Sequence, residues 1–281
     1  MTQHTFKLPN GYTIPALGYG TFRTPDGPET ENAVRDAILA GYRHIDGAAV
    51  YGNEKSVGRV IKASGIDRKE LFLTSKLWND NKGYEATKAA VNQTLEDLQT
   101  DYLDLYLIHW PIAKASNGAW QEANSESWRA MEELYNAGVI KAIGVSNFLP
   151  HYLEALFATA KVKPMVNQLE IHPGHLQEEA VAYSKEQGLL VEAWAPFANG
   201  QIFDQPLLQE IAKRYNKNVA QISLRWLLQK DILPLPKSVT PARMAANLEV
   251  FDFTISDEDM KAIDGVTGCE GSGLHPDKVD F

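Results

Sequence analysis

The chain has 281 residues, of which 44% are hydrophobic and 22% charged, a balance typical of a globular protein with a large core. Its formal net charge of -9 disfavours nucleic acid and anionic membranes as partners. The single cysteine, Cys269, excludes an internal disulfide, and no apolar run resembles a signal peptide or a membrane span, so we expect a cytoplasmic protein.

The predicted elements are an N-terminal hairpin followed by alternating strands and helices. Asn10-Gly11 lies between alternating residues within 6–15, a pattern that predicts a tight turn. Asn53 is the expected N-cap of the second helix, and Pro234 and Pro236 predict a short last strand. The expected strands are residues 15–22, 44–48, 71–77, 102–109, 140–146, 165–170, 189–195 and 232–237. The expected helices are residues 28–40, 53–64, 83–98, 125–137, 149–160, 176–187, 204–214, 218–230, 241–250 and 256–264.

This alternation predicts an α/β fold with a parallel sheet. Several strands, such as LDLYLIH, are continuous apolar runs, as expected when both faces of a sheet are covered. Eight strand–helix units in about 250 residues predict a (β/α)8 TIM barrel. It would carry an N-terminal β-hairpin and two extra helices, as a single domain over residues 1–281. A doubly wound open sheet is the alternative, but GYGTFR (18–23) lacks the third glycine and the helix of a phosphate-binding loop.

Polar residues end several of the predicted strands. In a barrel of this kind, active-site residues lie at the C-terminal strand ends. Each residue alone has an ordinary structural explanation, and Ser146-Asn147, for example, would cap the next helix. Asp46, Lys76 and His109 nevertheless end three successive strands, which favours a shared site. The further residues at strand ends are Ser146, Asn147, Gln168, Glu170, Trp194, Lys237 and Ser238.

Tyr51 follows Asp46 closely and completes a possible proton-donating group. A phenol titrates near ~10, too high for an efficient acid at neutral pH. The ammonium of Lys76 would lower that pKa, and the Asp46 carboxylate would keep the lysine charged. Neutral His109 would hydrogen-bond a substrate carbonyl oxygen as it becomes an alkoxide. None of these groups supplies a hydride, so a cofactor is required.

The segment 233–247 suggests where such a cofactor binds. From Glu210 to Arg243 the chain has seven Lys or Arg and two acids, whereas from Met244 onward it has two Lys and nine acids. Lys237 and Ser238 at a strand end, with Arg243 and Asn247 one helical turn apart, suit a nucleotide 2'-phosphate and an adenine. The alternative is a routine strand–helix junction.

Six segments together resemble the aldo-keto reductase family, in the family's order. They are GYRHIDGAAVYGNEKSVG (41–58), KLW (76–78), DLYLIHWP (104–111), IKAIGVSNF (140–148), MVNQLEIHP (165–173) and LPKSVTPARMAAN (235–247). The sequence is most similar to the prokaryotic branch with 2,5-diketogluconate and methylglyoxal reductases, which is typically monomeric.

The resemblance implies a barrel that reduces small aldehydes and ketones, including dicarbonyls or keto-sugar acids, with NADPH and without a metal. It implies Tyr51 as the general acid, Lys76 and Asp46 as its tuning pair and His109 as the substrate-orienting residue. The implied cofactor-binding residues are Gly20, Thr21, Phe22, Asp46, Ser146, Asn147, Gln168, Trp194, Pro196, Lys237, Ser238, Val239, Arg243 and Asn247. The implied substrate-binding residues are Phe22, Tyr51, Trp78, His109 and Trp110.

The chain departs from the family pattern at four places, which bear on cofactor affinity and on the preference between NADPH and NADH. Gly47 and Ile171 replace a common threonine and tyrosine, Ala246 replaces an acid or glutamine near the adenine, and residues 197–200 replace the usual turn over the pyrophosphate.

Three other functions compete with a reductase. A barrel lyase would use Lys76 as a Schiff-base nucleophile, although pairing with Asp46 disfavours this. A non-catalytic nucleotide sensor would keep the same residues without turnover. A metal hydrolase using His172 and His175 is disfavoured, because these histidines flank Pro173-Gly174 rather than lie on a helix.

Overall fold

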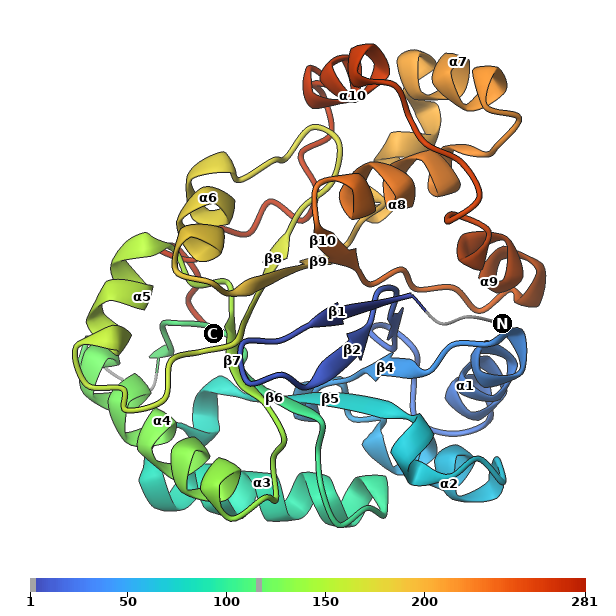
Figure 1. Ribbon diagram of the computed structural model, residues 1–281. Coiled ribbons are helices and arrows are strands. Elements are labelled where there is room, and N and C mark those ends of the chain that lie inside the picture. Colours follow the sequence, from blue (N-terminus) through green and yellow to red (C-terminus); the bar gives the residue numbers. More distant parts are fainter. Residues whose placement is uncertain (1–3, 115–117) are drawn as a thin grey trace.

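The computed structural model describes residues 4–114 and 118–281, which form a barrel of parallel strands surrounded by helices (Figure 1). The antiparallel hairpin consists of β1 (Thr5–Lys7) and β2 (Thr13–Pro15). The barrel strands are β3 (Tyr19–Gly20), β4 (His44–Asp46), β5 (Phe72–Leu77), β6 (Leu105–Ile108), β7 (Ile143–Ser146), β8 (Val166–Glu170), β9 (Leu190–Trp194) and β10 (Ile232–Pro234). The predicted (β/α)8 class is therefore confirmed.

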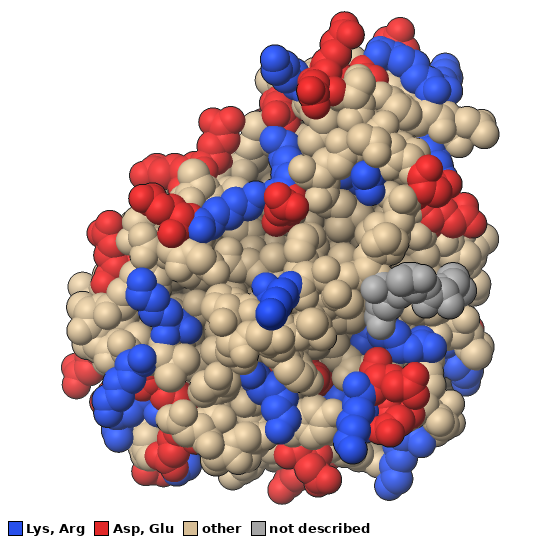
Figure 2. All heavy atoms as spheres, in the orientation of Figure 1, with Lys and Arg blue, Asp and Glu red and all other residues tan. Residues whose placement is uncertain are grey.

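The hairpin covers the end of the barrel where the strands begin. The side chain of Asn10 donates to the Lys141 carbonyl at 2.9 Å, and the Tyr12 hydroxyl donates to Asp104 at 2.6 Å. Both acceptors precede a barrel strand. On this face, basic and acidic side chains are interspersed (Figure 2). The C-terminal strand ends consequently open on the opposite side.

The first and last strands close the barrel through a short seam. The amides of Gly18 and Gly20 donate to the carbonyls of Pro234 and Pro236, at 3.1 and 3.0 Å. A Cβ at Gly18 would lie 2.4 Å from a Leu235 methyl group and 2.7 Å from His44 Nδ1, so a larger residue here would force these buried side chains to shift. Both prolines take part in this seam through their carbonyl oxygens, so their lack of an N–H group removes no hydrogen bond from it. As predicted, the last strand is short.

Helices form the outer layer, and their bounds differ modestly from prediction. They are α1 (Pro28–Ala40), α2 (Glu54–Ala63), α3 (Tyr84–Leu98), α4 (Trp120–Asn136), α5 (Pro150–Phe157), α6 (Glu178–Glu186), α7 (Pro206–Arg214), α8 (Val219–Gln229), α9 (Pro241–Leu248) and α10 (Asp257–Asp264). The start predicted at Ser125 is wrong, because α4 begins at Trp120, whose ring packs edge-on against Tyr152 with centroids 4.8 Å apart. Across both described ranges, no helix has the length and apolar character needed to cross a membrane.

Gly58 lets α2 pack directly on the end of α3. A Cβ at this position would lie 2.5 Å from the Asp97 carbonyl oxygen and 2.7 Å from the Leu98 carbonyl carbon. Both are backbone atoms that cannot rotate away, so Gly58→Ala is expected to lower the free energy of unfolding by about 1–3 kcal/mol. Urea denaturation measures this loss.

Gly265→Ala is the matched control for that measurement. Gly265 has φ -82, and its added Cβ would lie 3.5 Å from the Ala262 carbonyl, an ordinary contact. A change within about 0.5 kcal/mol is expected there. Equal stability of the two variants would show that α2 and α3 move apart without cost.

Candidate active site

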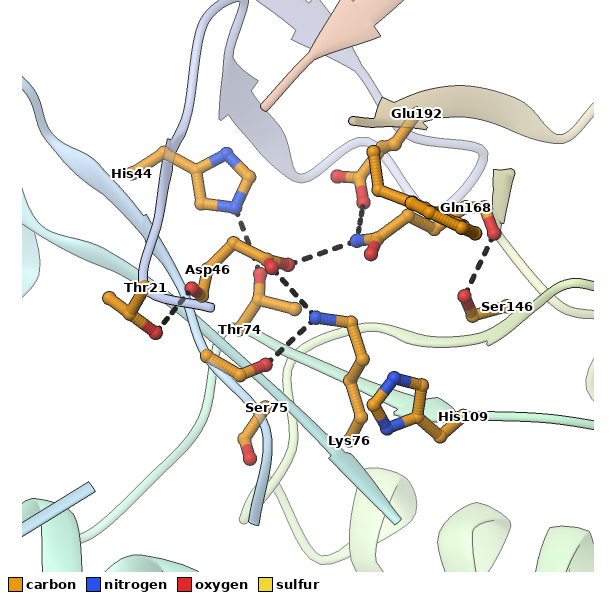
Figure 3. Close-up of polar contacts among 12 residues, drawn as sticks. Thr21, His44, Asp46, Thr74, Ser75, Lys76, His109, Ser146, Gln168 and Glu192 are labelled. Atoms are coloured by element: carbon orange, nitrogen blue, oxygen red, sulfur yellow. Dashed lines mark hydrogen bonds and ion pairs between the residues drawn. The ribbon is translucent and has the colours of Figure 1, made fainter. Parts of the chain in front are cut away.

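Asp46 and Lys76 form a buried ion pair at the C-terminal end of β4 and β5 (Figure 3). The Lys76 ammonium donates to Asp46 Oδ1 at 2.7 Å and to the Gly47 carbonyl at 2.8 Å. The exposed fractions of Lys76 and Asp46 are 1% and 4%. Gly47 thus acts through its carbonyl. This backbone contact does not depend on the side chain at position 47, and a Cβ there would make only ordinary contacts, 3.5 Å from the Thr74 carbonyl.

The ion pair determines the charge of Lys76. Burial lowers the pKa of this lysine, but the Asp46 carboxylate and the Tyr51 phenol outweigh burial, and the net pKa is raised. Lys76 is therefore an ammonium ion. A Schiff-base nucleophile needs a free amine, so this environment argues against the lyase.

Tyr51 is carried over the ion pair by a short turn, η1 (Ala49–Tyr51). Gly52 continues the turn with φ 67, a left-handed conformation that suits glycine. Asn53 occupies the N-cap position of α2, as predicted, but its side chain makes no capping hydrogen bond. Its side chain instead donates to the carbonyls of Thr21 and Thr24, both at 2.9 Å. Asn53 thereby anchors the turn and places the Tyr51 ring 5.3 Å from Lys76 Nζ.

The phenol of Tyr51 is protonated in this environment. Burial raises its pKa, and the nearby Asp46 adds to this, while the Lys76 ammonium acts in the opposite direction. The expected net lowering of the pKa is wrong, because burial disfavours the phenolate more than one ammonium favours it. Tyr51 is therefore a neutral proton donor beside the Lys76 ammonium. This cation can stabilise the phenolate that Tyr51 becomes after it gives up its proton.

His109 follows β6 and faces Tyr51. The two ring centroids are 5.9 Å apart, and Trp78 lies 5.3 Å away on another side. Burial and, secondarily, the Lys76 ammonium hold the pKa of His109 well below its usual value, so the imidazole is neutral. Its Nδ1 has no partner within residues 4–114 and 118–281. A neutral imidazole beside a phenol can hydrogen-bond a substrate oxygen without competing for its proton.

Aromatic side chains surround the mouth of the site. Phe22 is 52% exposed and lies 4.9 Å from the Tyr51 ring. The ring of Phe281, from the far end of the chain, lies 5.5 Å from each of Trp78 and Trp110. A cavity of about 510 Å³ beside them is lined by Trp78, Asp80, Lys114, Asp280 and Phe281. Phe281 was not predicted as part of the site, because no local pattern in the sequence links it to β5 or β6.

The four residues implied to hold the nicotinamide lie together. Ser146 Oγ donates to the Gln168 carbonyl at 2.8 Å, and Trp194 Nε1 donates to Asn147 Oδ1 at 2.9 Å. Asn147 has φ 63, and its buried side-chain amide donates to the His109 carbonyl at 3.0 Å. Helix α5 is preceded instead by Leu149, so the helix-cap interpretation of Ser146-Asn147 is wrong.

The basic segment follows β10 and continues into α9. Its backbone is held by the Tyr19 hydroxyl, which donates to the Ser238 carbonyl at 2.7 Å. Val239 is exposed, and Arg243 and Asn247 lie one turn apart on α9, with Arg243 exposed and Asn247 buried. Among the described residues, no acid forms an ion pair with Lys237 or Arg243. Both cations are therefore available to an anionic ligand.

Two further loops border the same end of the barrel. A Cβ at Gly20 would lie 3.8 Å from Lys237 Cβ, and Thr21 Oγ1 donates to the Asp46 carbonyl at 2.9 Å. Pro196, after β9, accepts a hydrogen bond from Ser223 Oγ at 2.7 Å. The backbone around it is strained, with positive φ at the non-glycine residues Ala195, Ala198 and Asn199. The residues predicted for cofactor binding thus lie in the barrel strands, in the segments that follow them, or on α9.

His172 and His175 lie in the loop after β8, where their backbones form an isolated bridge. Their ring centroids are 5.6 Å apart. Within the described ranges, no group of three or more His, Cys, Asp or Glu side chains is arranged to hold a metal ion.

Comparisons with known proteins agree with this geometry. The family model described as "Aldo/keto reductase family" matches residues 16–267. Glyoxal reductase of Bacillus subtilis (strain 168) is 48% identical over 277 residues, covering 99% of this chain and 98% of that protein. A 9,11-endoperoxide prostaglandin H2 reductase of Trypanosoma cruzi (strain CL Brener) is 43% identical, with 96% and 94% covered.

Solved structures show the same fold. MGS-M4, an aldo-keto reductase from a deep-sea metagenome library, has a TM-score of 0.91 and 43% identity, with 98% of this chain and 100% of that chain covered. A Bombyx mori aldo-keto reductase in complex with NADP has a TM-score of 0.87 and 37% identity, with 94% and 92% covered. From its sequence, its barrel and the residues gathered at the strand ends, the chain belongs to the aldo/keto reductase family.

Proposed function

We propose that this protein reduces small aldehydes and ketones, dicarbonyls among them, to alcohols with NADPH as the hydride donor. The observation that carries the proposal is the cluster of Tyr51, Lys76, Asp46 and His109. It combines a protonated phenol, a buried ammonium and a neutral imidazole at one point. The relative named glyoxal reductase and a structural relative determined with NADP support the substrate class and the cofactor.

The chain's own residues fit that cofactor. Lys237 and Arg243 are two cations without a described acidic partner, as a 2'-phosphate requires. Ser238 adds a hydroxyl beside them, and Asn247 lies one turn after Arg243 for an adenine. Ser146, Asn147, Gln168 and Trp194 would hold the nicotinamide end, and the strained backbone near Pro196 would border the pyrophosphate.

Four side chains would carry out the protein's part of the reaction. NADPH, when bound, supplies the hydride that forms the new C–H bond at the carbonyl carbon. Tyr51 donates its proton to the carbonyl oxygen, so the product is the alcohol. Lys76 stabilises the phenolate that remains, and Asp46 keeps Lys76 charged. His109 hydrogen-bonds the same oxygen, and Tyr51 regains a proton from water before the next turnover.

The cavity beside Trp78 and Phe281 favours small substrates, since aromatic rings surround the position where a carbonyl would reach Tyr51. A carbonyl panel assayed with NADPH and with NADH tests this proposal. Turnover of small aldehydes or dicarbonyls is expected, and no NADPH oxidation with any carbonyl would contradict it. A single domain over residues 1–281, a monomeric state, a cytoplasmic location and the lack of nucleic-acid partners stay predictions.

Arg243→Ala and Lys237→Ala are expected to raise KM for NADPH about tenfold or more, because each removes a charge-assisted contact to the 2'-phosphate. KM for NADH, which lacks this phosphate, should change less. Steady-state kinetics with one dicarbonyl measures both constants. Lys55→Ala removes an exposed cation on α2 and is the control. Equal increases for both nucleotides would show that these residues do not contact the 2'-phosphate.

A further inference from the structure

Glu192 is a fully buried carboxyl group that the sequence analysis did not assign. It lies on β9 in register with Gln168 of β8, and its exposed fraction is 0%. Gln168 Nε2 donates to Glu192 Oε2 at 2.7 Å and to Asp46 Oδ2 at 2.9 Å (Figure 3). Glu192 is thus joined to the Asp46–Lys76 pair through one amide nitrogen.

These two contacts fix the orientation of the Gln168 amide. A side-chain amide has two N–H donors on nitrogen and one carbonyl acceptor. Asp46 and Glu192 occupy both donors, and Asp46 is itself held by Lys76 through its other oxygen. Turning the amide over would place its carbonyl oxygen against the Asp46 carboxylate, which has no hydrogen to donate, and would lose that hydrogen bond. Gln168 Oε1 accepts no hydrogen bond from the described residues, so this end is free for a ligand.

We propose that Glu192 is a positioning residue, which with Asp46 holds the Gln168 amide so that its carbonyl oxygen accepts from the carboxamide N–H of a nicotinamide. The inference rests on the proposed function, since it takes the nicotinamide as the ligand of Gln168. Asp46 alone constrains one N–H and leaves the amide able to rotate about that bond. Glu192 supplies the second fixed point.

The protonation state of Glu192 gives a second observable. Burial and, next, the Asp46 carboxylate raise its pKa to about 8, while the hydrogen bond from Gln168 and, to a smaller extent, Lys76 act in the opposite direction. Asp46 on β4 and Lys76 on β5 are the charged groups that act on it. Below about pH 8, Glu192 is neutral and Asp46 is balanced by Lys76. Above that pH, a second negative charge appears beside the proposed nicotinamide site.

Three variants test the positioning role through nucleotide affinity, measured as the Kd of NADPH by tryptophan fluorescence. Glu192→Leu removes the acceptor and is expected to weaken NADPH binding about tenfold. Glu192→Gln keeps an acceptor oxygen and is expected to bind within about twofold of the wild type. Glu132→Gln is the control, because Glu132 is a buried carboxyl that accepts from the Lys161 and Val162 amides, remote from the site. Thermal unfolding of each variant separates lost affinity from lost stability.

A pH titration needs only the wild type and Glu192→Gln. The measured quantity is the ratio of the Kd values for NADP+ and NADPH. Both forms carry the same phosphates, so any effect of pH on phosphate binding cancels in this ratio. Ionised Glu192 attracts the positive nicotinamide ring of NADP+, so raising the pH through about 8 should favour NADP+ on the order of fivefold in the wild type. The ratio should stay constant in Glu192→Gln.

Distinct results would overturn the inference. Unchanged NADPH affinity in Glu192→Leu, or equal loss in Glu192→Gln, would show that the acceptor oxygen does not position Gln168. A ratio that is constant with pH in the wild type would show that Glu192 does not act at the nicotinamide. A wild type that binds neither nucleotide would instead overturn the proposed function and this inference with it.

Discussion

Tyr51→Phe is expected to lower kcat/KM for a reactive aldehyde by about 10²–10⁴-fold, because it deletes the proton donor and little else. The phenylalanine ring keeps the contacts with Phe22 and His109, so the turn that carries it should stay in place. The Kd for NADPH should therefore remain close to that of the wild type. Stopped-flow measurement of NADPH oxidation gives the rate, and fluorescence titration gives the affinity.

The competing functions give different results in the same experiment. Tyr84→Phe, which alters a half-buried tyrosine on α3 whose hydroxyl donates to Glu133 rather than to the site, should retain full activity. A nucleotide sensor would bind NADPH in the wild type but turn over no carbonyl. A lyase would keep its activity in Tyr51→Phe and form a borohydride-trapped adduct at Lys76 without nucleotide. Unchanged NADPH oxidation in Tyr51→Phe would remove Tyr51 as the acid.

Lys76→Met is expected to abolish most turnover and to lower the free energy of unfolding by about 3–5 kcal/mol. The substitution leaves Asp46, 4% exposed, as an unpaired buried anion beside an apolar side chain. Urea denaturation measures the loss.

The double variant Lys76→Met/Asp46→Asn separates stability from catalysis. Removing both charges should restore much of the stability lost in Lys76→Met, because no unpaired ion remains. Activity should stay low, because Tyr51 still lacks the neighbouring ammonium. A double variant as unstable as Lys76→Met would show that packing around Lys76, rather than its charge, accounts for the loss.

The barrel and the centre of its candidate site follow from simple rules of sequence. Continuous apolar runs predict strands covered on both faces, and parallel strands bring their C-terminal ends to one side. Asp46 and Lys76 were predicted as partners on this basis, and they lie 2.7 Å apart. Their pairing needed only the residue type and the position at a strand end.

Features that depend on long-range packing were not predictable in this way. Phe281 reaches Trp78 and Trp110 only because the C-terminal segment returns across the barrel mouth. Asn53 occupies the N-cap position of a helix, yet its side-chain NH2 donates to two loop carbonyls and its side chain does not cap the helix. One feature of the sequence could have identified Glu192, because it is a lone acid inside an apolar strand. It lies two residues before Trp194, and residues two apart on a strand share a face.

The seam between β3 and β10 has a mechanical consequence. The hydrogen bonds that close the barrel at this seam run from glycine amides to proline carbonyls. The stability of the closed barrel depends on this short junction. Gly20 lies on one side of it and Lys237 on the other. In the proposed function, a bound nucleotide contacts both residues and so links β3 to the segment after β10 across the seam. Because it binds only the closed form, its binding energy adds to the stability of the whole barrel.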